Sequence, residues 1–155
     1  MMDQIRDYKD VDSAKLCRTI LAVMSTVRRP ITLDELAVFV DIPEEASAEY
    51  QALAETIRLC GSFLTIRNRT ISLIHQFAKD FLLGDAAQGI FPSGIKEIHY
   101  LVFSRSLHIM SRILQRDIYS LVSPGSSIND VKLPNPDPLA AARYSCVYWV
   151  DHLDD

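Results

Sequence analysis

The chain has 155 residues, of which 48% are hydrophobic and 23% charged, and its formal net charge is −4 at pH 7. These proportions are typical of a globular protein and exclude extensive disorder. No apolar run approaches the roughly 20 residues that span a bilayer, and the polar start of the chain is unlike a secretory signal. The acidic balance also lacks the positive excess of a nucleic-acid or membrane-surface binder. We therefore expect a cytoplasmic protein without a membrane partner.

Helical signals dominate the first sixty residues. After a charged, flexible lead-in at 1–12, apolar residues on one face predict a helix at about 13–28, which Pro30 stops. Thr32 and Glu35 form a capping box for a short second helix, with Ile31 and Leu36 as its hydrophobic staple. A third helix is expected at about 44–59, before Gly61.

The apolar period then changes from helical to alternating. Residues 62–67 and 70–75 read as two strands, joined by a tight turn at Asn68 and Arg69, and a helix is expected at 76–83 with Gly84 as its stop. Three helices followed by a hairpin are the order of a winged helix, a variant of the helix-turn-helix. The sequence therefore predicts a mainly α chain with a winged-helix domain at 13–84.

Beyond the winged helix we expect three further segments. A loop and a long amphipathic helix fill 85–122, with the helix at about 96–121. Residues 123–137 read as a stiff Pro-rich linker, and 138–155 as a C-terminal docking helix. Tyr144, Tyr148 and Trp149 are packing anchors, either within this chain or against a following domain. Cys17, Cys60 and Cys146 are widely spaced in apolar contexts, so we expect buried, reduced thiols.

A winged helix raises the alternative of a small DNA-binding transcriptional regulator, in which the third helix enters the major groove. Here that helix carries Glu44, Glu45, Glu49 and Glu55 against a single Arg58. Because phosphate neutralisation supplies most of the affinity for DNA, an acidic recognition helix is repelled. Arg67 and Arg69 in the hairpin are read as a solvated turn. A protein-contact role is therefore favoured over nucleic-acid binding.

Several segments resemble one family in order along residues 10–155. They are LCGSFLTI at 59–66, IHQFAKDFL at 74–82, RDIY at 116–119, PDPL at 136–139 and YSCVYWVDHL at 144–153. Together they resemble the region that follows the NACHT nucleotide-binding domain in fungal NOD-like receptors. These are signal-transduction ATPases of the vegetative-incompatibility type, and their winged helix often carries the label "GPI inositol-deacylase winged helix". The resemblance implies a non-catalytic regulatory module of innate immunity that holds the NACHT core in its inactive ADP state.

The resemblance also implies partners and one site residue. The partner is a NACHT domain in cis or in trans, and WD40, ankyrin or tetratricopeptide repeats usually follow the last segment in this family. A histidine at the end of the last wing strand contacts the ADP phosphates in related ATPases, and His75 occupies the matching place. Gln76 departs from the plant pattern, which has Asp there. The other interpretation of His75 is that it packs and caps the helix start.

Other chemistry lacks support in the sequence. There is no GxxxxGK[ST] phosphate loop and no GxSxG nucleophile elbow, so no cofactor and no enzymatic activity are predicted. Cys60 and His75 have no third orienting residue, and the four histidines lack metal-ligand spacing. The basic stripe of the long helix, Arg105, His108, Arg112 and Arg116, could dock on an acidic surface, but a solvated face is the favoured interpretation.

Overall fold

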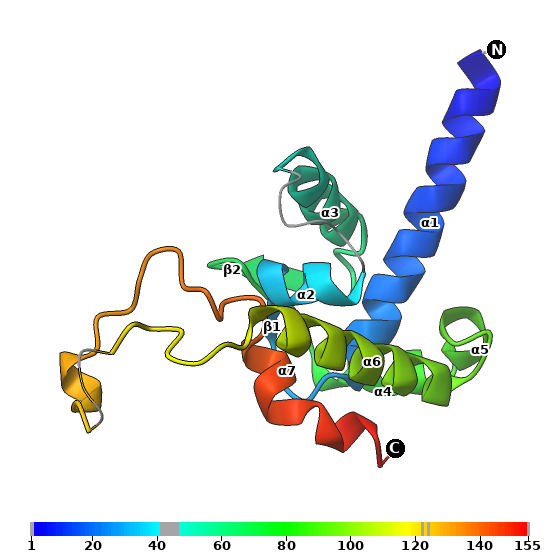
Figure 1. Cartoon of the computed structure of the whole chain (residues 1–155). Coiled ribbons are helices and arrows are strands. Elements are labelled where there is room, and N and C mark those ends of the chain that lie inside the picture. The colour runs from blue at the N-terminus through cyan, green and yellow to red at the C-terminus, as the bar shows by residue number, and fades with distance from the viewer. Residues whose placement is uncertain (1, 41–46, 122, 124, 155) are drawn as a thin grey trace.

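The computed structural model describes residues 2–40, 47–121, 123 and 125–154. The first helix, α1, spans Met2–Thr26, so it begins well before the predicted start and includes most of the residues assigned to the lead-in. Its second half carries the core residues Ile20, Val23 and Met24, all buried. Figure 1 shows its first half projecting away from the other elements.

The second helix confirms the predicted start signal. α2 spans Leu33–Phe39, the Thr32 side chain accepts from the Glu35 N–H at 3.2 Å, and the Glu35 carboxylate accepts from the Thr32 N–H at 2.9 Å. Ile31 and Leu36 are both fully buried, as a hydrophobic staple requires. Just before α2, Ile31–Thr32 forms the short strand β1, which the sequence analysis did not predict.

The third helix is followed by the β-hairpin that forms the wing. α3 spans Ser47–Leu59, and the predicted start at about residue 44 lies outside the described residues. Strands β2 (Leu64–Arg67) and β3 (Thr70–Leu73) are antiparallel, and Asn68 and Arg69 both take positive φ angles of 50° and 63°. Two such residues make the turn that matches the twist of a hairpin, so the turn forms without glycine. β1 pairs with β3, which gives the sheet order β1-β3-β2.

The remaining helices pack around this unit. α4 spans Gln76–Leu83 as predicted and ends at Gly84, and the unpredicted α5 spans Ala87–Ile90. The long helix α6 spans Ile95–Ile113 and packs against α1, α2 and α7. Figure 1 shows α6 crossing the molecule between α2 and the C-terminal segment. A mainly helical chain with a small antiparallel sheet confirms the predicted winged-helix fold class.

The segment after α6 differs from the prediction. α6 stops at Ile113 rather than near residue 121, and Asp117 and Ser120 take positive φ angles. The Asp117 carboxylate accepts from the Leu121 N–H at 2.7 Å, and such local side-chain bonds compete with helix. Between Leu121 and α7, the described residues contain one regular element, the short 3-10 helix η1 (Ile128–Asp130). Figure 1 shows this part of the chain as a long loop that extends away from the helices.

The C-terminal helix is shorter than predicted. α7 spans Arg143–Tyr148 and is followed by the 3-10 helix η2 (Val150–His152). Residues 139–142 form turns, because the Asp137 carbonyl accepts from Ala140 and the Leu139 carbonyl from Ala142. The Asp137 carboxylate accepts from the Leu139 N–H and the Tyr119 hydroxyl at 3.0 Å each. These bonds replace the α-helical start expected at residue 138.

Cys60 is buried as predicted, but the prediction of reduced thiols was wrong for Cys17 and Cys60. Cys17 in α1 and Cys60 after α3 are joined in a disulfide, with their Cα atoms 6.7 Å apart. Cys146 is a free thiol on an exposed residue rather than a buried one. The reason is tertiary, since α1 and α3 pack side by side and bring together two residues that lie 43 positions apart.

Candidate functional site

His75 lies at the junction of β3 and α4. It is the N-cap of α4, with extended backbone angles of −151° and 156°. Its ring Nδ1 accepts a hydrogen bond from the Phe77 N–H at 3.4 Å, and its ring stacks on Phe77 with centroids 5.1 Å apart. Because Nδ1 accepts, the neutral ring carries its proton on Nε2. The capping interpretation of His75 thus has a geometric basis, and it leaves Nε2–H as a donor that no described residue binds.

A cavity of about 480 Å³ opens beside His75. The end of α1 with the loop after it, the end of β3 and the start of α4 form its walls, which include Arg28, Arg29, His75, Gln76 and Lys79. None of the described lining residues is acidic. The positive end of the α4 dipole faces the same region, so the cavity suits an anion. The amide of Gln76, the residue that departs from the family pattern, donates to Asp80 at 3.2 Å, within α4 itself.

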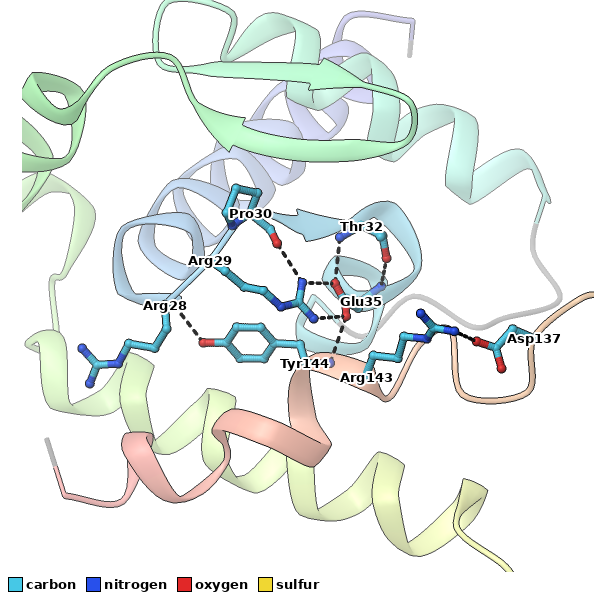
Figure 2. A network of polar contacts seen from close by, with 8 residues as sticks. All are labelled: Arg28, Arg29, Pro30, Thr32, Glu35, Asp137, Arg143 and Tyr144. Carbon is cyan, nitrogen blue, oxygen red and sulfur yellow. Dashed lines mark hydrogen bonds and ion pairs between the residues drawn. The ribbon is translucent and has the colours of Figure 1, made fainter. Parts of the chain in front are cut away.

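Glu35 holds Arg29, one of the lining residues of this cavity, in place. Its buried carboxylate receives two hydrogen bonds from Arg29, at 2.7 and 3.0 Å, and one from the Tyr144 N–H at 2.9 Å (Figure 2). The hydrogen bonds to Glu35 raise the pKa of the Arg29 guanidinium above its usual range. Arg29 also lies over the Tyr144 ring, 5.3 Å from its centroid. One carboxylate therefore ties together the end of α1, the start of α2 and the start of α7.

Tyr144 continues this network on the other side. Its hydroxyl accepts from the Arg28 N–H at 3.0 Å and contacts His152 Nε2 at 2.8 Å. Burial raises the pKa of Tyr144 to about 12. His152 in turn places its Nδ1 3.0 Å from Nδ1 of His99 on α6, so one ring donates and the other accepts. The sequence analysis treated Tyr144 as a packing anchor and assigned no role to His99 or His152. No local signal links these residues, because they come from distant parts of the chain.

The other predicted aromatic anchors also pack within the chain. Trp149 stacks on Phe103 of α6 with centroids 6.0 Å apart, and Tyr148 lies against Tyr144 at 4.9 Å. Beside them, Val147 is 66% exposed and Leu153 is 59% exposed. In the basic stripe, Arg105 is half-buried, His108 and Arg112 are exposed, and Arg116 lies beyond the end of α6.

The charged side chains of the wing and of the third helix bear on the alternative of DNA binding. Arg69 forms an ion pair with Asp34 at 3.0 Å, which offsets its charge, whereas Arg67 is exposed. Of the acidic residues on the third helix, Glu55 is exposed. Glu44 and Glu45 lie outside the described residues, and so does the side chain of Glu49.

The structure also bears on the catalytic and metal-binding alternatives. Cys60 is bonded to Cys17, so a nucleophilic pair of Cys60 and His75 is not available in this state. The described residues bring together no group of three or more His, Cys, Asp or Glu side chains suited to a metal ion. Among the helices in the described ranges, none combines the length and the hydropathy that a membrane crossing needs.

The helices and the β-hairpin wing define a winged-helix protein. The chain belongs to the family described as GPI inositol-deacylase, winged helix domain, whose model matches residues 7–92. The chain is 50% identical, over 167 aligned positions, to the Vegetative incompatibility protein HET-E-1 of Podospora anserina. That alignment takes in 100% of this chain but 12% of the relative. No solved structure matches.

These comparisons confirm the resemblance to the winged-helix region of fungal NACHT proteins of the vegetative-incompatibility type. A winged-helix domain homologous to part of such a protein fits a non-catalytic module.

Proposed function

We propose that this chain is a regulatory, protein-binding module of a fungal NACHT-type receptor in the cytoplasm. It holds the nucleotide-binding core, in cis or in trans, in the inactive ADP-bound state. The observation that carries the proposal is the cavity of about 480 Å³ at the junction of β3 and α4, with His75 and Lys79 in its lining. The homology to HET-E-1 supports the association with a NACHT protein.

The chemistry of this cavity supports contact with a phosphate. Nε2–H of His75 is a donor, Lys79 adds a positive charge, and the start of α4 favours an anion. Without a phosphate loop this chain does not cradle the nucleotide alone. His75 would therefore add one contact to ADP that the NACHT domain already binds. A domain that contributes one contact to a nucleotide held elsewhere is well suited to sense the state of that nucleotide.

The surface around His75 supports contact with a protein. Phe77 is 76% exposed, and Ile74 and Phe81 are also exposed on the same short stretch. Because the rings of His75 and Phe77 stack on one another, a partner that reaches His75 also meets Phe77. Apolar side chains beside a polar site are typical of a protein interface. A following repeat domain would cover a second apolar region, at Val147, Val150 and Leu153.

The decisive experiment measures ADP release from a full-length receptor that carries this module. Replacement of His75 with Ala removes both the phosphate contact and the helix cap. We expect release to accelerate about tenfold, because a hydrogen bond to a charged group contributes about 1.5 kcal/mol or more. Replacement of His75 with Asn keeps a good N-cap and shortens the side chain, so we expect similar acceleration without loss of stability.

The matched control is His108→Ala, which removes an exposed histidine from α6. That variant should release ADP at the wild-type rate. If His75→Asn also releases ADP at the wild-type rate, His75 serves only as a cap and the phosphate assignment fails.

A further inference from the structure

Strand β2 forms one edge of the three-stranded sheet. The Phe63 carbonyl accepts from the Ile74 N–H at 2.9 Å, and the register continues with Thr65 opposite Ser72. In an antiparallel ladder, alternate residues turn their backbone groups toward the partner strand. Phe63 and Thr65 thus face β3, whereas Leu64 and Ile66 turn their N–H and C=O groups to the outer edge.

Only some of these outward N–H and C=O groups have hydrogen-bond partners. The Leu64 N–H donates to the Cys60 carbonyl at 3.1 Å. The N–H and the carbonyl of Ile66 have no hydrogen-bond partner among the residues that the structure describes. Ile66 itself is half-buried against the core. An edge with unpaired donors and acceptors is a template for one more strand.

A groove lies between β2 and α3 and reaches Leu33 at the start of α2. A cavity of about 410 Å³ extends from Gly61, before β2, to Arg69 in the hairpin turn. Leu64 and Ile66 form one wall, and Ala54, Ile57 and Arg58 of α3 form the other. α3 and β2 lie next to one another in the molecule (Figure 1). The groove therefore offers apolar side chains beside the backbone of β2.

The charge of the groove limits what it accepts. Its described lining contains Arg58 and Arg69 and no carboxylate, and the exposed Glu55 of α3 is not part of that lining. Arg69 is paired with Asp34, which does not line the groove, whereas Arg58 is exposed. An extended segment with an acidic residue would place its carboxylate near Arg58 and its alternate apolar side chains between β2 and α3.

We propose that the outer edge of β2, with the groove between β2 and α3, binds an extended, acidic protein segment as a fourth strand. This site lies apart from the His75 cavity, with which it shares no lining residue, and it does not depend on the nucleotide-linked function.

The test uses the full chain, labelled with ¹⁵N, and the peptide acetyl-Glu-Val-Thr-Val-Glu-amide as the probe. Binding as a strand should shift the amide signals of Leu64 and Ile66 and slow the hydrogen exchange of the Ile66 amide. The charge-reversed peptide acetyl-Lys-Val-Thr-Val-Lys-amide should bind about threefold more weakly, as expected for an exposed ion pair. In the Arg58→Glu variant, the lysine peptide should bind more tightly than the acidic peptide, because the exposed charge at the groove changes sign.

Backbone pairing is tested with an acetyl-Glu-Val-Thr-Val-Glu-amide peptide that is N-methylated at both valines and at the threonine, so that donors on both edges of the strand are blocked. This peptide keeps the side chains but loses backbone donors, so it should not protect the Ile66 amide. The proposal is overturned if the methylated peptide binds as well as the parent. It is also overturned if the shifts fall on α4 or α6 rather than β2, or if duplex DNA perturbs the β2 amides while the acidic peptide does not.

Discussion

The carboxylate of Glu35 accepts a hydrogen bond from the backbone N–H of Tyr144 at 2.9 Å, although the two residues lie 109 positions apart. The same carboxylate completes the capping box of α2 and pairs with Arg29 (Figure 2). A helix-capping residue is thereby also the anchor of the C-terminal segment. This double role makes Glu35 a sensitive position for the stability of the whole chain.

Replacement of Glu35 with Ala should lower the free energy of unfolding by about 3 kcal/mol, because it leaves the Arg29 guanidinium and two backbone N–H groups without their acceptor. Urea denaturation followed by circular dichroism measures this change. Replacement of Thr32 with Ala removes only the cap and should cost about 1 kcal/mol. Equal losses in the two variants would show that the contacts of Glu35 with Arg29 and Tyr144 together contribute nothing.

Tyr144 should make stability fall at alkaline pH. The pKa of Tyr144 is raised from 10.0 to about 12 in the folded chain, so folding favours the protonated hydroxyl. This contribution is fully present below pH 10 and is lost as the pH rises toward 12. In Tyr144→Phe, the fall in stability between pH 10 and pH 12 should therefore be smaller than in the wild type.

The same substitution should cost about 1–3 kcal/mol at neutral pH, since Arg28 N–H and His152 lose the hydroxyl that they contact. Tyr100, which is 64% exposed, provides the control. Tyr100→Phe should keep the alkaline slope of the wild type. An unchanged slope in Tyr144→Phe would contradict the assignment.

The side-chain hydroxyl of Ser106 should lower the stability of the folded chain. Its hydroxyl on α6 is fully buried and has no hydrogen-bond partner among the described residues. Ser106→Ala removes this unsatisfied group and should raise the free energy of unfolding by about 1 kcal/mol. Ser104→Ala is the comparison, because the Ser104 hydroxyl donates to the Leu101 carbonyl at 3.1 Å. A clear loss of stability in Ser106→Ala would mean that this hydroxyl has a partner.

The disulfide between Cys17 and Cys60 should stabilise the fold through the loop that it closes. For a sequence separation of 43, the loop-entropy model predicts a loss of about 4 kcal/mol on reduction. Urea denaturation with and without a reductant measures this loss. Cys146→Ser should respond like the wild type, whereas Cys17→Ala should be insensitive to the reductant. Alkylation of three thiols in the oxidised, native chain would contradict the pairing.

The local elements were predictable because their signals lie within a few residues of one another. The capping box needs only Thr32 and Glu35, and the wing turn needs only two residues that tolerate positive φ. Gly84 likewise stops α4 where the sequence indicated. The position of His75 as the residue between β3 and α4 followed from the same local pattern.

Other features depend on contacts that sequence spacing does not encode. β1 has only two residues and forms because β3 lies beside it. The apolar period of α6 continues past Ile113, but Leu114 takes extended backbone angles and the helix ends there; further on, Asp117 bonds the Leu121 N–H. The sequence by itself thus determined which short segments are helix, strand or turn, since those choices rest on backbone preferences and neighbouring side chains. Only the tertiary structure decided that Glu35 meets Tyr144 and that Cys17 meets Cys60, because partners that lie far apart in the chain are selected by packing.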